Sequence, residues 1–308
     1  MADITLQSLR GDPARLRREA TMRTLLTGAA MLSLVISGLI VYSLVREAWT
    51  FIVHVEWDTV LASDGWFPRR GLFDVRTLLV GSFVVTIVAM ALAAPLGLGA
   101  AIYLSEYANP RVRRMLKPIL EIIAGIPSVV LGFFVLTFVS PKIVQGLLFP
   151  EANQFNLLAA GLGVGILTIP LVASVAEDAL RSVPSSLREA SYGMGAKKVT
   201  TVVRVVLPAA VSGLVAAFIL AVSRAVGETM VVFIAGGAGG GALYHVDPLK
   251  PGLTMTAAMA SQASGTDQVV GAQLTFQSLF FVGLLLFAIT FVLNIIGDRF
   301  VRRVRQAY

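Results

Sequence analysis

The sequence contains no cysteine, only two histidines and comparatively few charged residues. Without cysteine, the 308-residue chain can form neither a disulfide nor a thiolate metal site. His54 and His245 lie far apart along the chain, so no spacing typical of a metal site appears. Charged residues make up 14% of the chain, whereas a soluble protein usually has about a quarter. These shortages exclude cysteine-stabilised scaffolds and argue against a soluble fold.

Nucleotide-binding and catalytic motifs are also missing. No Gly-Lys dipeptide occurs, so the chain has no Walker A loop to cradle ATP phosphates. No cluster of the Ser/His/Asp type is visible, and no internal repeat of the kind common in secondary transporters appears. We therefore expect that the chain is not an enzyme and binds no cofactor of its own.

Hydrophobic residues dominate the sequence, at 56% of the chain with a mean hydropathy of +0.81. Such a composition is typical of a polytopic membrane protein, and it predicts an all-α membrane protein with six transmembrane helices. The net charge of +7 fits either nucleic-acid binding or the excess of cytoplasmic Lys and Arg in membrane proteins, and we favour the second reading. The predicted spans are residues 24–45, 77–105, 118–139, 156–176, 208–234 and 276–297.

The basic residues predict the orientation of these spans. Of the 25 Lys and Arg residues, 18 fall in four segments and six fall in the alternating loops. Because Lys and Arg concentrate on the cytoplasmic side, both termini should be cytoplasmic. The four basic segments are residues 1–23, 106–117, 177–207 and 298–308.

The predicted organisation begins with a basic N-terminal segment, residues 1–23, which can form an amphipathic helix on the inner leaflet. A signal peptide is the alternative, but the apolar run Thr24–Val45 is 22 residues long, beyond the usual h-region of about 7–15. Residues 24–76 then hold the first span and an external loop with Trp49, Trp57 and Trp66, which either anchor the interface or contact an external partner.

Residues 77–297 form the predicted core, followed by a basic tail, residues 298–308. Pro95 predicts a kink in the second span, and Gly161 with Gly165 predicts close approach of the fourth span to another helix. A short loop is expected at 140–155 and a long, glycine-rich loop at 235–275.

The polar segment 177–207 lies between two apolar runs and is expected to be a cytoplasmic loop. Pro184-Ser185-Ser186 indicates a helix start, with Ser185 or Ser186 as cap and Glu189 in the first turn. Gly193 and Gly195 indicate a sharp exit from that helix. The pattern predicts a short helix, parallel to the membrane, that docks into a soluble partner.

This segment resembles the EAA loop of ABC importer permeases, whose pattern is E-A-A-x3-G-x9-I-x-L-P. The chain differs from it by Ser191 in place of the second Ala and Val205 in place of Ile. In that family the loop forms the coupling helix held in a groove of the ATPase subunit. The resemblance therefore assigns ATPase coupling to Glu189, Ala190, Ser191, Gly195, Leu207 and Pro208.

Two charged residues, Arg224 and Glu228, interrupt the predicted fifth span. A charge at the centre of a membrane helix costs roughly 2.5–3.5 kcal/mol. Their spacing of four residues predicts that the side chains face each other on one helix. Either they form a structural ion pair, or they mark a water-filled path in which Arg224 attracts an anion that competes with Glu228.

The motif Arg-x-x-Gly-Glu-Thr-Met, from Arg224 to Met230, resembles that of PstC-type permeases of phosphate-specific ABC importers. The related PstA-type permeases typically continue with Ala-Pro, where this chain has Met230-Val231. Further similar stretches run from Pro95 to Tyr107 and from Leu120 to Val130. The resemblance implies a role in phosphate translocation for Arg224 and Glu228, and we add Thr229 of the same motif.

The resemblance also implies the type I ABC importer permease fold in a bacterial inner membrane. The expected partners are a second, PstA-type permease subunit, two PstB-type ATPase subunits that bind ATP and Mg²⁺, a PstS-type extracytoplasmic phosphate-binding protein, phosphate and membrane lipid, but no nucleic acid. Two alternatives stay open: a permease for another oxyanion such as molybdate or phosphonate, and a secondary transporter or membrane sensor without an ATPase.

Overall fold

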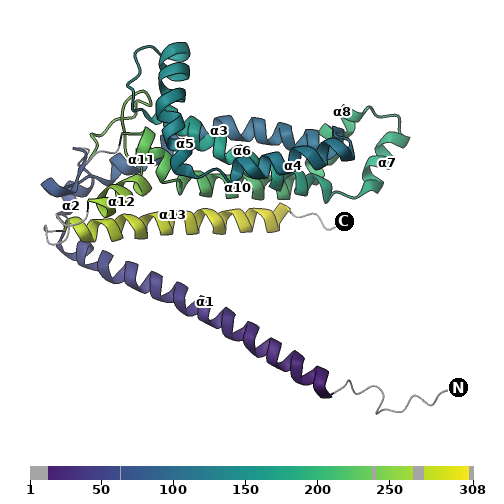
Figure 1. The fold of residues 1–308 in the computed structure, drawn as a ribbon, viewed down its shortest axis with the longest axis horizontal. Coiled ribbons are helices and arrows are strands. Elements are labelled where there is room, and N and C mark those ends of the chain that lie inside the picture. The colour runs from purple at the N-terminus through teal and green to yellow at the C-terminus, as the bar shows by residue number, and fades with distance from the viewer. Residues whose placement is uncertain (1–12, 63, 238–240, 266–273, 305–308) are drawn as a thin grey trace.

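The computed structural model describes residues 13–62, 64–237, 241–265 and 274–304, and most of these residues are helical. Five long helices form the framework (Figure 1). They are α1 (Pro13–His54), α3 (Val75–Ile102), α6 (Leu157–Arg181), α10 (Val211–Val226) and α13 (Thr275–Val304). The shorter helices are α2 (Trp57–Val60), α4 (Pro110–Ala124), α5 (Ser128–Phe134), α7 (Ser185–Gly193), α8 (Lys198–Thr201), α9 (Leu207–Ala209), α11 (Met230–Ala235) and α12 (Met255–Ser264).

Several irregular turns connect these helices. Three segments are π-helical: η2 (Tyr103–Tyr107), η3 (Val135–Leu148) and η4 (Val202–Val206). A small antiparallel sheet pairs β1 (Trp66–Phe67) with β2 (Leu72–Phe73) around the short 3-10 turn η1 (Pro68–Arg70). We call the end with β1, β2 and α12 the outer end, and the end with α7 and α8 the inner end (Figure 1).

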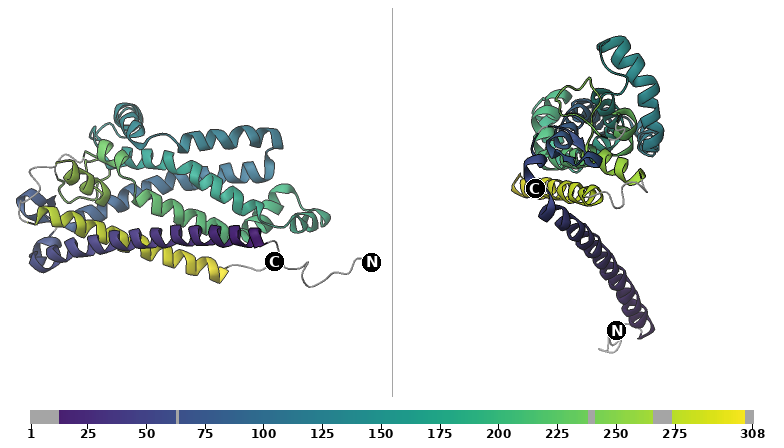
Figure 2. Two further views of the ribbon diagram at one scale, coloured as in Figure 1. Left: turned by 60° about the horizontal axis from the view of Figure 1, so that its bottom comes forward. Right: turned by 90° about the vertical axis from the view of Figure 1, so that its left-hand side faces the viewer.

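The helices α3, α6, α10 and α13 run side by side along the molecule (Figures 1 and 2). Glycines allow the tightest contact, between α3 and α6. A Cβ atom on Gly161 would lie 2.6 Å from Val88 Cβ, and one on Gly165 would lie 3.0 Å from the Ala89 carbonyl oxygen. The predicted close approach at Gly161 and Gly165 is therefore confirmed, since a larger side chain at either position would push the helices apart.

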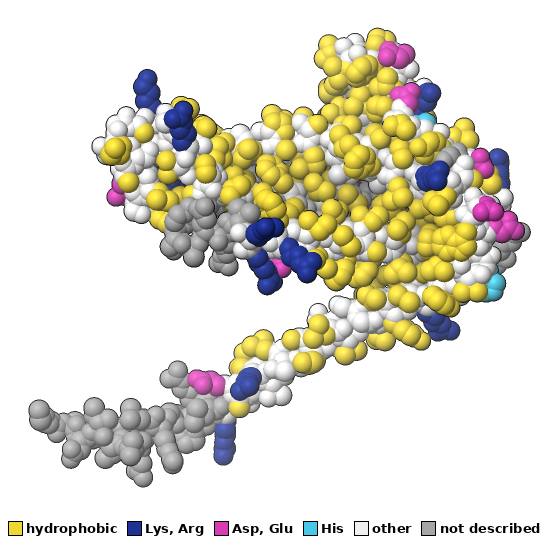
Figure 3. Space-filling view, turned by 180° about the vertical axis from the view of Figure 1, so that it is seen from behind, with side chains coloured by type: hydrophobic (Ala, Val, Ile, Leu, Met, Phe, Trp, Pro, Cys, Tyr) yellow, Lys and Arg dark blue, Asp and Glu magenta, His cyan; other side chains and the backbone are white. Residues whose placement is uncertain are grey.

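The six predicted spans agree with the structure in number. Among the described residues, five helices are long and apolar enough to cross a membrane, and the number is six when the bent pair 198–209 and 211–226 is counted as one span. Figure 3 shows a broad band of hydrophobic side chains across the middle of the face that it presents, with most charged side chains nearer the ends. The chain is thus a multi-pass, helical membrane protein.

Both ends of the described helical chain lie toward the inner end. The first residues of α1 and the last residues of α13 lie on the same side of the molecule as α7 and α8 (Figure 1). This arrangement is the one that the basic segments predict, with both termini on the cytoplasmic side.

The first span is much longer than predicted. Helix α1 runs without a break from Pro13 to His54, so the basic residues after Pro13 belong to the span's own helix and not to a separate surface helix. Residues 1–12 lie outside the described part of the chain. Of the three tryptophans, Trp49 and Trp57 are exposed, but Trp66 is only 1% exposed and packs against Phe73. The prediction of an anchor or docking role is therefore wrong for Trp66.

The third span is not the single helix predicted over residues 118–139. Helix α4 ends at Ala124, the chain turns at Gly125–Pro127, and α5 with η3 continues to Leu148. Proline has no amide hydrogen and disfavours a helical conformation of the residue before it, which ends α4 here. Figure 1 shows α5 and the helix that follows it standing at a steep angle to α3 and α6. The predicted loop at 140–155 is correspondingly shortened, because η3 extends to Leu148.

The predicted loop at 235–275 contains a helix, α12, which the sequence did not reveal. The Thr254 side chain accepts a hydrogen bond from the Ala257 amide and caps its N-terminus. Helix α12 is held against α3, because the Met255 amide donates to Ser82 Oγ at 3.0 Å. The flanking residues 238–240 and 266–273 lie outside the described part.

Candidate functional site

The loop predicted to couple to an ATPase, residues 177–207 together with Pro208, is called the coupling segment below, and its helix α7 lies exposed at the inner end. Helix α7 has no buried residue, and Glu189, Ala190 and Met194 face solvent. The helix begins one or two residues earlier than predicted, because Pro184, and not Ser185 or Ser186, occupies the cap position. Glu189 consequently lies in the second turn, not the first. The exposed face of α7 is available to a partner at the inner end.

Gly195 ends this helix as the sequence predicts. Its φ is +79°, a left-handed conformation that glycine adopts without steric cost. The Gly195 amide donates to the Tyr192 carbonyl at 2.9 Å, and the Ala196 amide donates to the Ser191 carbonyl at 3.1 Å. This pair of bonds is the Schellman motif, which satisfies the last carbonyls of α7 and turns the chain back.

Other residues of the coupling segment connect α7 to the neighbouring helices. Ser191 Oγ lies 2.8 Å from Thr201 Oγ1, which ties α7 to α8. Leu207 packs against the buried cluster that holds Leu180 and Val206, while Pro208 is exposed in α9. A bend of 72° then separates residues 198–209 from α10. The coupling segment is therefore continuous with α10 through one sharp bend.

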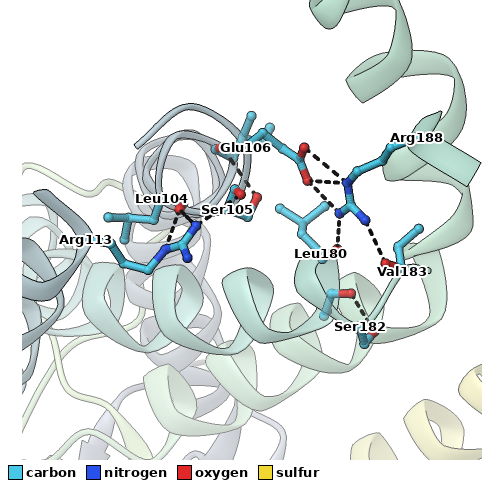
Figure 4. A network of polar contacts seen from close by, with 10 residues as sticks. Leu104, Ser105, Glu106, Arg113, Leu180, Ser182, Val183 and Arg188 are labelled. Carbon is cyan, nitrogen blue, oxygen red and sulfur yellow. Dashed lines mark hydrogen bonds and ion pairs between the residues drawn. The ribbon is translucent and has the colours of Figure 1, made fainter. Parts of the chain in front are cut away.

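One ion pair joins α7 to η2, the segment that directly follows α3 (Figure 4). Arg188 Nη2 lies 2.7 Å from Glu106 Oε1, and the same guanidinium donates to the carbonyls of Leu180 and Val183. Nearby, Lys198 Nζ lies 4.8 Å from the centre of the Tyr107 ring. The Arg188–Glu106 pair is mostly buried, and charge-assisted bonds of this length are strong.

A second group of charges joins α4 to α6. The Glu177 side chain is fully buried, and neither of its carboxylate oxygens has a hydrogen-bond partner in the described chain. Three cations surround it: Arg113 Nε at 3.5 Å, Lys117 Nζ at 3.5 Å and Arg181 Nη1 at 3.8 Å. Arg113 also donates to the Leu104 carbonyl from Nε at 2.8 Å (Figure 4). These cations offset the cost of burying a carboxylate.

The prediction that Arg224 and Glu228 face each other on one helix is wrong, and so is the alternative of a structural ion pair between them. Helix α10 ends at Val226, so the two residues do not share one helix and form no ion pair with each other in the described chain. Glu228 instead lies two residues before α11, where its Oε1 is 3.5 Å from the Val231 amide nitrogen. Its backbone carbonyl accepts a hydrogen bond from Thr256 Oγ1, and Thr229 Oγ1 donates to the Gly227 carbonyl. Gly227 ends the helix and removes the four-residue register on which the prediction depended.

Arg224 faces a different neighbourhood, an open cavity of about 230 Å³ between α4, α6 and α10. Four ionisable side chains line it: Lys117, Glu121, Glu177 and Arg224. Arg224 is exposed and has no ion-pair partner among the described residues. Glu228 and Thr229 do not line this cavity. An arginine with free donors beside a lysine is suited to binding an oxyanion.

The sequence interpretation missed most of the charges that surround these residues. Glu106, Arg113, Lys117, Glu177 and Arg188 appeared only as loop charges, although each forms a contact at the inner end. The sequence offered one signal that could have identified two of them. Glu106 and Glu177 are each the first charged residue after a long uncharged run. Within the described ranges, no group of three or more His, Cys, Asp or Glu side chains is placed to hold a metal ion.

The sequence of this chain is similar to those of transport permeases. A family described as binding-protein-dependent transport system inner membrane component matches residues 93–306. The phosphate transport system permease protein PstC of Mesorhizobium japonicum is 32% identical over 90% of this chain and 88% of its own length. A probable ABC transporter permease protein, YqgH of Bacillus subtilis, is 35% identical over 70% of both chains. The phosphate transport system permease protein PstA 1 of Mycobacterium tuberculosis is 33% identical over 63% of this chain.

A solved structure shares the fold. The inward-facing MetNI methionine ABC transporter contains a chain that aligns with 75% of this chain and 96% of its own length, with a TM-score of 0.56 and 24% identity. At this identity the likeness concerns the fold alone. The predicted permease fold of an ABC importer is thereby confirmed.

Proposed function

Because this chain belongs to the family of binding-protein-dependent transport system inner membrane components, we propose that it is the permease subunit of an ATP-driven importer of inorganic phosphate. The proposal joins two findings: relatives named as phosphate permeases, and an arginine without a partner on an open cavity in the described chain. Arg224 is the observation that carries it. A guanidinium with free donors recognises a phosphate oxygen pair, and the neighbouring carboxylates keep the anion from being held tightly.

The proposed partners follow from the family, which is described as binding-protein-dependent, and from relatives named as phosphate permeases. ATP and Mg²⁺ would be bound by two PstB-type ATPase subunits, one of which contacts the exposed face of α7 around Glu189 and Ala190. A PstA-type permease would supply the other half of the path, and a PstS-type binding protein would deliver phosphate at the outer end. The complex would lie in a bacterial inner membrane.

The contacts at the inner end support a mechanical link between the ATPase and the cavity. A movement of α7 reaches α3 through the Arg188–Glu106 pair. Arg113 connects the end of α3 to α4 and to Glu177 on α6. These contacts reach two of the walls of the cavity that Arg224 lines. The 72° bend carries the same movement to α10 directly.

Uptake measurements test this function. The complete transporter is reconstituted in vesicles, and uptake of labelled inorganic phosphate is measured for the parent and for Arg224→Gln. We expect uptake to fall at least tenfold, because a charge-assisted hydrogen bond to the anion is lost. Co-purification of the ATPase should stay unchanged. Normal uptake by the assembled Arg224→Gln complex would contradict the anion role.

Another oxyanion is the second candidate function, because the cavity shows cationic groups without a feature that selects one tetrahedral anion. Competition of phosphate uptake by molybdate or a phosphonate distinguishes the two candidates. A transporter without an ATPase is tested by Glu189→Lys, which reverses a charge on the exposed face of α7. Uptake that is unaffected by this change would favour that third class.

A further inference from the structure

We propose that Lys117 is a second anion-binding residue, which receives the anion from Arg224 on the cytoplasmic side of the path. The proposal extends the phosphate-permease function proposed above and rests on it. Lys117 comes from α4 and Arg224 from α10, and both side chains line the same open cavity of about 230 Å³. The chemical class of the ligand is a small tetrahedral oxyanion, for which inorganic phosphate is the probe.

The contacts of Lys117 are loose enough to be exchanged. Its Nζ lies 3.5 Å from Glu177 Oε2 and 3.4 Å from Asp178 Oδ1, well beyond the roughly 2.7–2.9 Å of a strong charge-assisted bond. The side chain is one-third exposed, and an ammonium group has three donors. The Arg188–Glu106 pair, at 2.7 Å and with little exposure, shows what a tight ion pair looks like in this protein.

Glu177 does not depend on Lys117 alone. Arg113 and Arg181 also lie within 3.8 Å of its carboxylate. If Lys117 turns toward an anion, two cations still accompany the buried Glu177. The large penalty for leaving a buried charge unpaired therefore does not arise.

The same arrangement explains how the anion leaves. An oxyanion bound between Arg224 and Lys117 accepts hydrogen bonds from a planar guanidinium and from an ammonium group. Glu121 lines the same cavity and repels it, and the Glu177 carboxylate competes with it for Lys117. Lys117 can then return to Glu177 and Asp178, and the anion moves on toward the cytoplasm.

A purely structural role for Lys117 makes a different prediction. In that case Lys117 only ties α4 to α6, and both Lys117→Gln and Asp178→Asn would loosen this tie and lower phosphate binding and uptake together. A binding role predicts opposite effects, because Asp178→Asn frees the ammonium group for the anion. The pair of variants therefore separates the two roles.

The experiment measures equilibrium binding of inorganic phosphate to the purified transporter complex without its binding protein, and uptake by the complete system. We expect Lys117→Gln to weaken phosphate binding about tenfold, Lys117→Arg to restore most of it, and Asp178→Asn to strengthen it about twofold. Arg114→Gln is the matched control on α4, since Arg114 is exposed and donates to the Pro110 carbonyl at 3.4 Å. The control should bind phosphate like the parent.

A charge rescue provides a second test that does not depend on the glutamine variant. The chain has no cysteine of its own, so Lys117→Cys places a single thiol in it. A positively charged aminoethyl reagent should restore phosphate binding, and a negatively charged sulfonatoethyl reagent should not. The parent complex, treated in the same way, controls for thiols of other subunits.

Two results would overturn the inference. One is unchanged phosphate binding in Lys117→Gln while Arg224→Gln loses it, which would leave the proposed function intact. The other is an equal loss in Lys117→Gln and Asp178→Asn, which would assign Lys117 a structural role. If Arg224→Gln itself binds and transports phosphate normally, the proposed function fails instead.

Discussion

The outer and inner ends of this molecule are held together by different kinds of contact. At the outer end, buried aromatic side chains and backbone hydrogen bonds dominate, as between Trp66 and Ala242 or between Gly252 and Gly236. At the inner end, ion pairs join separate helices, with Glu106 and Glu177 at their centres. Backbone bonds and close packing define one arrangement, whereas the more exposed ion pairs of the inner end, such as Lys117 with Asp178, can exchange partners at modest cost. We therefore expect the inner end to move during transport and the outer end to stay fixed.

The inner end should show the largest effect of a single change. Replacing Arg188 by Met leaves the mostly buried Glu106 without its partner, and we expect a loss of about 3–5 kcal/mol in unfolding free energy. Thermal unfolding of the purified complex measures it. The double variant with Glu106→Met should recover most of this stability, because no buried charge is then left alone.

If Arg188→Met and the double variant are equally unstable, the ion pair is not what holds the inner end together. The double variant also shows whether the ion pair is needed for transport as well as for stability. We expect the transporter complex that contains this double variant to hydrolyse ATP with little phosphate uptake, because the ion pair between α7 and η2 is gone.

The stability of the outer end should depend on side-chain volume instead of side-chain charge. A Cβ atom on Gly81 would lie only 2.2 Å from the Leu253 backbone carbonyl oxygen, so Gly81→Ala should cost about 1–3 kcal/mol. Gly99→Ala in the same helix is the matched control, because a methyl group at Gly99 would meet no neighbouring atom within 4 Å. Alanine is the better helix former, so the control should be neutral or slightly stabilising. Equal destabilisation by both would argue against tight packing at Leu253.

A smaller effect is expected inside the coupling segment. Ser191→Ala removes the hydrogen bond to Thr201, at a cost of about 0.5–1.5 kcal/mol. Alanine is the residue of the EAA pattern at this position, so we expect phosphate uptake to stay within about twofold of the parent. Loss of uptake in an assembled Ser191→Ala complex would show that the α7–α8 bond itself transmits movement.

The smallest effect concerns Asp247 in the outer loop. A hydrogen bond from the Leu249 amide, with a lesser contribution from Lys250, lowers the pKa of the Asp247 carboxyl below its ordinary value of 3.8. The stabilisation is therefore complete above pH 3.8 and is lost as the pH falls through the lower folded-state pKa. The difference in thermal stability between the parent and Asp247→Asn should shrink on acidification below pH 4. If the difference in thermal stability does not change with pH, the hydrogen bond between the Asp247 carboxylate and the Leu249 amide is not its cause.

Much of the architecture follows from local sequence patterns. Long uncharged runs predict the spans, the distribution of Lys and Arg predicts their direction, and Gly195 predicts the end of α7. The breaks in the third and fifth spans were not predicted, although Pro127 and Gly227 are visible in the sequence. Proline and glycine occur within continuous membrane helices as well, since α3 runs unbroken through Pro95. Neighbouring helices decide whether such a residue breaks the helix.

In the candidate site, too, some features were predicted from the sequence and others depend on how the helices pack. The sequence singled out Arg224 and Glu228 as costly charges in an apolar span, and the structure places Arg224 on a cavity and Glu228 at the start of another helix. Lys117 and Glu177 could not be joined from the sequence, because they lie on α4 and α6, far apart along the chain. Only the packing of these helices brings them together.

By itself, the sequence determined that this protein lies in a membrane, and it predicted the side of its polar loops and the loop that we propose for ATPase coupling. These properties depend on hydrophobicity, charge and short-range backbone preferences, which each segment carries alone. The tertiary structure decided which charges meet, where the helices break and which side chains line the cavity. Those outcomes depend on contacts between distant segments, and such contacts arise only when the helices pack against one another.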